Sequence, residues 1–201
     1  MGRNPSQWPI FRFFLGGEDA RTNPSAQHNI EFHKITKPDY DPRTLSIRPA
    51  GITDVQFIMT LESAPENTDQ VDNSSFMVHS QNICSGDYSY FIIESAQDVR
   101  PLGFVILHAP ERDGVVILQR IVVWAKAKGI GSFFIRGLIS RLQNDPDFEK
   151  MILYIKQTKS GPDMALIEFW ENAGFQIDED RHFQSRGHIM MSKDLQSSSV
   201  I

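Results

Sequence analysis

The chain has 201 residues, 40% of them hydrophobic and 22% charged, with a formal net charge of −5, which favours one well-cored domain over two full-sized ones. A net acidic chain argues against nucleic acid as a partner, because nucleic-acid affinity rests on Lys and Arg side chains that neutralise phosphates. Cys84 is the single cysteine, which excludes an intrachain disulfide and favours a reducing, cytoplasmic compartment, and no apolar run reaches the roughly 18 residues of a membrane helix, so no membrane association is predicted.

Residues 1–43 are the least regular part of the sequence. An aromatic cluster at 8–15 is followed by two glycines and a long polar stretch. The apolar run is too short and too interrupted for a secretory signal. We expect an N-terminal arm that packs on the following domain or on a second copy, which leaves a homodimer open, or that stays partly disordered.

The first part of the domain is predicted to contain a strand, two helices and a strand hairpin. Apolar and polar residues alternate at 45–50, as in a half-buried strand. A turn at 51–54 precedes apolar residues at near-helical spacing from Val55 to Leu61. The pattern then predicts a polar, acidic loop at 63–75, a short helix at about 74–80 and β-rich strands at 89–94 and 102–107.

The central stretch reads as a buried strand, a glycine turn and a helix. The strand covers Val115 to Val123, the basic turn covers 124–132, and an apolar face with Phe134, Leu138 and Leu142 marks the helix at 129–144. Main-chain N–H groups gather at such a helix N-terminus and favour an anion. With two lysines in the turn, the stretch predicts a ligand that carries phosphate.

The last part continues with a buried strand at 151–155 and a helix that starts within 160–163, with Pro162 in its first turn, and ends at Gly174. Leu166, Phe169, Trp170 and Ala173 form the predicted face of this helix. Two strands, at about 175–179 and 187–192, close the domain. The predicted order is β, α, α, three meandering strands, α, β, α, β, β.

Two common phosphate-binding motifs do not fit the glycine turn. A P-loop needs a lysine directly after its last glycine, and Gly131 is followed by Ser132. A dinucleotide fingerprint needs a third glycine where the chain has Phe134, and the preceding hairpin argues against an all-parallel sheet.

In its place among the elements, the turn resembles a known motif. Lys126-Ala127-Lys128-Gly129-Ile130-Gly131 is similar to the acetyl-coenzyme A signature of the GNAT superfamily of N-acetyltransferases, with Lys where the family has Gln or Arg. The segment 163–175, which ends in Gly-Phe, resembles the family's later helix, and 188–195 resembles its last strand. The resemblance spans residues 45–195.

The resemblance implies an α/β fold of the α+β type, a mixed and mostly antiparallel sheet of six to seven strands flanked by helices. It implies acetyl transfer from acetyl-CoA, as co-substrate, to a primary amine by direct attack. The end of the central strand would bind the pantetheine arm, the N–H groups of the turn would bind the pyrophosphate, and the strand at 150–155 would splay from its neighbour. The implied cofactor-binding residues are Ile121, Val122, Val123, Lys126, Lys128, Gly129, Ile130, Gly131, Ser132, Asp163 and Trp170.

Two residues depart from the family pattern. Trp170 stands where the family often has a Tyr general acid, and an indole N–H cannot deliver a proton at neutral pH. Asp163 stands where the family has Asn, and it reads equally well as a helix cap. Trp170 likewise reads equally well as plain core.

The catalytic residues stay unassigned. Gln119 and Arg120 are polar within an apolar strand, so they face the cleft, an edge or a buried salt bridge. His108, Glu94, Tyr154 and Asp178 could reach a cleft, although surface or strand-end roles are commoner for such residues. The histidines show no ligand spacing, so no metal is predicted.

We therefore predict an N-acetyltransferase domain at 44–196 between the arm and a tail at 197–201, acting on a small molecule or a protein. The alternative is a non-catalytic acyl-CoA-binding or interaction module on the same fold. The acceptor pocket would be built by residues 63–88 and the last strands. The acidic residues Glu62, Glu66, Asp69 and Asp72 would suit a cationic acceptor, or form a solvated loop.

Overall fold

The computed structural model describes residues 45–96, 99–109, 114–124, 126, 129–158, 161–178 and 187–196. The predicted arm, the tail and Lys128 lie outside these residues. Within them the chain forms one seven-stranded sheet in the order β1-β2-β3-β4-β5-β7-β6. Only the pairing of β4 with β5 is parallel, so the prediction of a mixed, mostly antiparallel sheet is confirmed.

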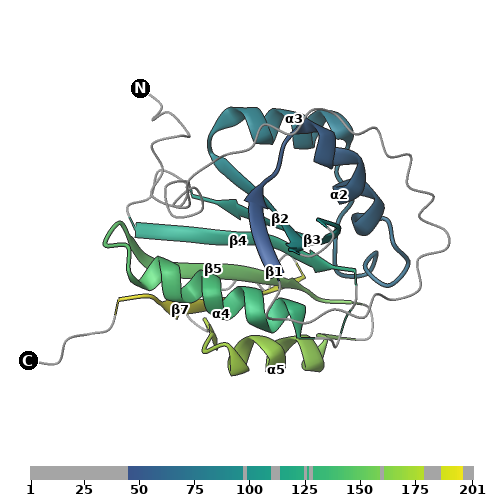
Figure 1. Cartoon of the computed structure of the whole chain (residues 1–201). Coiled ribbons are helices and arrows are strands. Elements are labelled where there is room, and N and C mark those ends of the chain that lie inside the picture. Colours follow the sequence, from purple (N-terminus) through teal and green to yellow (C-terminus); the bar gives the residue numbers. More distant parts are fainter. Residues whose placement is uncertain are drawn as a thin grey trace, which may run out of the picture.

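The order of the elements along the chain is the predicted one (Figure 1). A short 3-10 helix, η4, covers Ile52–Asp54. The strands are β1 Leu45–Pro49, β2 Tyr88–Ser95, β3 Pro101–His108, β4 Gly114–Val123, β5 Phe148–Lys156, β6 Gln176–Ile177 and β7 His188–Asp194. The α-helices are α2 Val55–Glu62, α3 Phe76–Ser85, α4 Ile130–Gln143 and α5 Met164–Asn172.

Helices cover both faces of the sheet, with α2 and α3 on one side and α4 and α5 on the other (Figure 1). The larger apolar cluster, the α4-side core, contains the predicted stripe of α4 together with Ile167 and Trp170 of α5. The smaller one, the α2-side core, contains Phe57, Ile58 and Leu61 of α2. Burying such stripes against a sheet is what stabilises short helices that would be marginal alone.

Helix α3 is longer than the 74–80 predicted for it. Ser75 caps its start by accepting a hydrogen bond from the Val78 N–H at 3.3 Å, and Gly86 ends it in the left-handed conformation with φ 81°. Its one buried residue is His79, while Phe76 and Met77 are exposed. The usual apolar stripe is therefore missing, which explains why periodicity underestimated the helix.

The ends of α5 correct one prediction and confirm another. Asp163 is the N-cap residue, so Pro162 precedes the helix and does not lie in its first turn. At the other end Gly174 adopts φ 87°, its N–H donates to Glu171 and the Phe175 N–H donates to Trp170. The helix therefore ends at a glycine, as predicted, and these two hydrogen bonds satisfy two carbonyls of its last turn.

Candidate functional site

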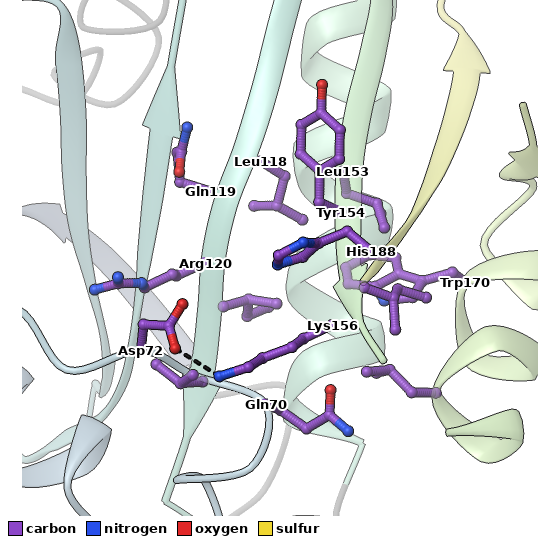
Figure 2. Close-up of a pocket in the computed structure, with 14 residues that line it drawn as sticks. Gln70, Asp72, Leu118, Gln119, Arg120, Leu153, Tyr154, Lys156, Trp170 and His188 are labelled. Atoms are coloured by element: carbon purple, nitrogen blue, oxygen red, sulfur yellow. Dashed lines mark hydrogen bonds and ion pairs between the residues drawn. The ribbon is translucent and has the colours of Figure 1, made fainter. Parts of the chain in front are cut away.

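Strands β4 and β5 separate halfway along their length. Their parallel register runs from Gly114 opposite Phe148 to Leu118 opposite Leu153 and stops there, although β4 continues to Val123 and β5 to Lys156. The predicted splay is thus present. A cavity of about 400 Å³ opens at this point (Figure 2), lined by Gln70, Val71, Asp72, Leu118, Gln119, Arg120, Ile121, Leu153, Tyr154, Ile155, Lys156, Leu166, Trp170 and His188.

A β-bulge at Gln119 reverses the faces of the sheet to which the later side chains of β4 point. Leu118 lies opposite Leu107 and Arg120 lies opposite Ile106, so Gln119 is an extra residue with no partner in β3. Leu118 belongs to the α4-side core, whereas Val122 belongs to the α2-side core. Strict alternation would put these two on one face, so the bulge reverses the orientation of all residues that follow it.

As a result, the cavity passes through the sheet and has two chemically different halves. The α4-side half, called here the apolar half, consists of Leu118, Ile121, Leu153, Ile155, Leu166 and Trp170. Side chains at alternate strand positions project to the opposite face. The half on the α2 side of the sheet, called the polar half, is lined by Gln70, Asp72, Arg120, Tyr154, Lys156 and His188 (Figure 2).

A buried polar network holds Arg120 in place. Arg120 Nη1 donates to Glu62 Oε1 and, at 3.2 Å, to Ser74 Oγ. Glu62 Oε2 accepts from the Ser74 N–H at 3.0 Å and lies 3.2 Å from His79 Nε2, and both the Glu62 and His79 side chains are fully buried. His79 Nδ1 in turn lies 3.2 Å from Tyr90 Oη.

The network sets the ionisation of its members. Burial by itself raises the pKa of the Glu62 carboxyl, but the hydrogen bonds from His79 and Ser74 and the charge of Arg120 outweigh burial and hold that pKa below its ordinary value. Burial raises the pKa of the Tyr90 phenol, so its hydroxyl stays neutral. Glu62 is therefore a carboxylate with every oxygen engaged, and it does not lie in the acidic loop where the sequence placed it.

A second ion pair bridges the polar half from the loop after α2 to the end of β5. Lys156 Nζ donates to Asp72 Oδ1 at 2.6 Å (Figure 2). This hydrogen bond lowers the pKa of the Asp72 carboxyl. Unlike the buried network, the pair is accessible, with 70% of the Asp72 side chain and 34% of the Lys156 side chain exposed.

Helix α4 starts next to α5, because a Cβ at Gly131 would lie 3.7 Å from the Phe169 ring, and its first amides are open. Gly129 is the N-cap residue, with φ 81° and no side chain to cap the helix, and no acidic residue lies in the first turn. The first intrahelical bond runs from the Phe133 N–H to the Gly129 carbonyl, so the N–H groups of 130–132 have no helical acceptor. Lys126 donates to the Glu66 carbonyl, which ties this turn to the loop after α2.

The free edge of β4 presents alternate main-chain groups toward the cavity. The Trp124 N–H donates to the Leu102 carbonyl at 2.7 Å, which fixes the phase of the ladder with β3. With this alternation, the main-chain N–H and carbonyl groups of Val122 point toward β3. Those of Ile121 and Val123 point to the opposite edge of β4, where β5 no longer pairs with it. The Ile121 side chain also lines the cavity.

Of the other residues predicted from sequence, Trp170, Gln119 and Arg120 line the cavity, whereas Asp163 caps α5. The Asp163 carboxylate caps α5 by accepting from the Leu166 N–H at 3.1 Å. Trp170 is 4% exposed, stacks edge-on against Phe169 and Phe175, and lines the cavity, so it is core and cavity wall together. Gln119 is exposed at the cavity, while Arg120 both lines it and forms a largely buried salt bridge.

Three of the four candidate cleft residues lie elsewhere. Glu94 is buried against Arg48, which it meets at 3.0 Å. His108 stacks on Tyr88, and burial lowers its pKa. Asp178 lines a separate surface hollow with Lys193. Tyr154 alone lines the cavity.

Sequence reasoning missed His188, which lines the polar half from β7. The signal was available, because His188 begins the predicted last strand, but only the β5–β7 register places it opposite Lys156. Among the described residues no group of His, Cys, Asp or Glu side chains could hold a metal ion. No described helix is long and apolar enough to span a membrane.

No protein-family model and no curated protein matches the sequence. Solved structures do match in fold. The spermidine N-acetyltransferase from Vibrio cholerae in complex with CoA and spermine has a TM-score of 0.60 at 16% identity, over 76% of this chain and 96% of that one. A chimera of that enzyme with hSSAT has a TM-score of 0.60 at 17% identity, over 76% and 96%. A dodecameric structure of the Vibrio cholerae enzyme in an intermediate state has a TM-score of 0.58 at 17% identity, over 76% and 95%. The chain therefore has the GNAT fold.

Proposed function

We propose that this chain is an acetyl-CoA-dependent N-acetyltransferase of the GNAT superfamily, which transfers an acetyl group to a primary amine. The observation that carries the proposal is the separation of β4 and β5 beyond Leu118, together with the uncapped N-terminus of the helix that follows β4. This arrangement offers a slot for a thioester arm and an anion site for its phosphates. The CoA bound by the Vibrio cholerae enzyme of the same fold supports it.

The cofactor is assigned to the apolar half of the cavity and the start of α4. The pantetheine amides would pair with the free main-chain groups of Ile121 and Val123, beside Val122 and against Trp170. The pyrophosphate would accept from the N–H groups of the turn and helix start, where the helix dipole adds to the attraction. That turn comprises Lys126, Lys128, Gly129, Ile130, Gly131 and Ser132, and Asp163 would orient α5 beside it.

The acceptor is assigned to the polar half. A neutral amine attacks the thioester carbonyl and a C–N bond forms, the nitrogen then loses a proton to solvent, and collapse of the oxyanion intermediate breaks the C–S bond. A main-chain N–H of β4 would stabilise the oxyanion. The thiol has a pKa of about 8.5, so the sulfur can leave as thiolate and take its proton from solvent. This route needs no proton from Trp170.

We assign removal of the ammonium proton to His188. It lines the polar half, and a ring nitrogen of an imidazole can accept a proton as a general base. Of the two carboxylates nearby, Asp72 is bonded to Lys156 and Glu62 to Arg120.

Calorimetric titration of acetyl-CoA into the wild-type protein and a Ser132→Glu variant tests the proposal. A carboxylate in the first turn of a helix is compatible with folding, yet it would occupy the phosphate position. Ser140→Glu, on the exposed face of the same helix, is the matched control. We expect binding in the wild type and the control and at least about tenfold weaker binding in Ser132→Glu.

Absence of acetyl-CoA binding in the wild type would overturn the proposal. Binding without turnover of any amine would instead favour a non-catalytic acyl-CoA module. A cytoplasmic location and a homodimer through residues 1–43 stay predictions. Size-exclusion chromatography of the full chain and of a chain without the arm would test the homodimer.

A further inference from the structure

We propose that the acceptor is a small amine that carries a carboxylate, bound by Arg120 and Lys156. The inference rests on the proposed function and names its substrate class. It differs from the acceptor of the fold neighbour, whose solved complex contains spermine, a polycation.

The charges of the polar half oppose a polycation. Among the described residues that line it, Arg120, Lys156 and His188 are basic and Asp72 is the one acid. Lys156 already neutralises Asp72 at 2.6 Å. Glu62 lies behind the wall, and all its hydrogen bonds serve Arg120, His79 and Ser74. A polyamine that displaced Lys156 from Asp72 would leave the lysine unpaired beside it and would still face Arg120, so it would gain no net attraction.

Arg120 is prepared to receive a carboxylate. The bulge at Gln119 turns its side chain into the polar half, and its bonds to Glu62 and Ser74 both use Nη1. Nε and Nη2, which share one edge of the guanidinium, have no hydrogen-bond partner among the described residues. This edge is the one that binds a carboxylate with two parallel hydrogen bonds. A fixed side chain gives up little further entropy when it does so.

Lys156 can exchange partners. Its bond to Asp72 is an exposed ion pair, and such pairs contribute little to stability because solvent screens them. An incoming carboxylate could replace Asp72 at little cost. The cavity of about 400 Å³ also holds the proposed thioester end, so the remaining space suits an amino-acid-sized acceptor.

Matched amines test the inference, with thiol release from acetyl-CoA as the readout. Each α-amino acid is compared with its carboxamide, which keeps the amine and shape but removes the negative charge, and lysine is compared with cadaverine; spermidine is included. We expect kcat/KM to favour the carboxylates by about tenfold or more. Titration of the same pairs into CoA-loaded protein provides a readout that needs no turnover.

Lys156→Gln should reduce the preference for carboxylates about fivefold or more without changing acetyl-CoA affinity, since it removes one of the two cations. Lys150→Gln is the matched control, because Lys150 lies on the same strand and pairs with Asp194 outside the cavity. The inference would be overturned if carboxamides or polyamines were used or bound as well as the carboxylates, or if Lys156→Gln left the preference unchanged. Acetyl-CoA binding in the same experiments would still support the proposed enzyme. Failure of acetyl-CoA to bind would mark the separate failure of the proposed function.

Discussion

Leu118 of β4 and Leu153 of β5 form the last parallel pair of these two strands, and the next residue of β4, Gln119, is bulged out of the ladder with β3. Within two residues, β4 therefore stops pairing with β5 and shifts its register against β3 by one residue. The loss of β5 as a neighbour opens the cavity, and the bulge determines which side chains line its polar half.

Gly103→Ala should destabilise the protein. An ideal Cβ at Gly103 would lie 2.5 Å from the Val122 carbonyl oxygen and 3.1 Å from the Val123 Cα, so β3 and β4 would have to move apart. We expect a loss of roughly 1–3 kcal/mol in the free energy of unfolding, measured in urea. Gly137→Ala, where a Cβ meets nothing within 4 Å on an exposed face of α4, should gain about 0.5–1 kcal/mol. Equal stability of the two variants would contradict the close approach.

Glu62→Gln should destabilise the protein by roughly 2–3 kcal/mol, less than for a fully buried pair because 21% of the Arg120 side chain is exposed. The folded-state pKa of Glu62 is lowered, so its contribution is complete above its ordinary pKa of 4.5 and is lost as pH falls through the folded value. The difference from wild type should thus be constant near neutral pH and shrink below pH 4.5. Exposed Glu171→Gln is the control, and a difference that grows in acid would refute the assignment.

Trp170→Phe should retain kcat within about threefold, because the indole N–H cannot serve as a proton donor at neutral pH. Trp170→Ala should cost about 3–5 kcal/mol of stability, since the ring is buried between Phe169 and Phe175. Steady-state thiol release and thermal unfolding measure the two effects. A hundredfold drop in kcat for the Phe variant would show that the indole takes part in the chemistry.

His188→Gln should lower kcat/KM by about 10²–10⁴ and leave acetyl-CoA affinity unchanged. A general base must be deprotonated to act, so kcat/KM of the wild type should fall in acid, and this fall should be absent in the variant. His108→Gln is the control, since His108 stacks on Tyr88 away from the cavity. A pH profile that survives in His188→Gln would move the base elsewhere.

Elements with a complete local pattern could be predicted from sequence. The α4 stripe of Phe134, Leu138 and Leu142 is periodic, and Gly174 marks a helix end by its chemistry. The splay of β5 was also expected, although from the family resemblance and not from pattern.

What could not be predicted depends on residues far apart in the chain. Glu62 follows the last apolar residue of α2 and reads as the first of a loop, yet it is buried because it meets His79 and Arg120, 17 and 58 residues away. The polar pair Gln119 and Arg120 reads as a break in a strand, and only the register with β3 reveals a bulge.

The bulge at Gln119 also places the side chains of the two halves of the cavity on opposite faces of the same strands. Beyond it, Arg120 shares one face with Tyr154 and Lys156, while Ile121 shares the other with Leu153 and Ile155. Substitutions on the first face can therefore change the polar half without altering the side chains of the apolar half. Under the proposed function, this one extra residue allows the acceptor side and the cofactor side of the same two strands to be changed separately.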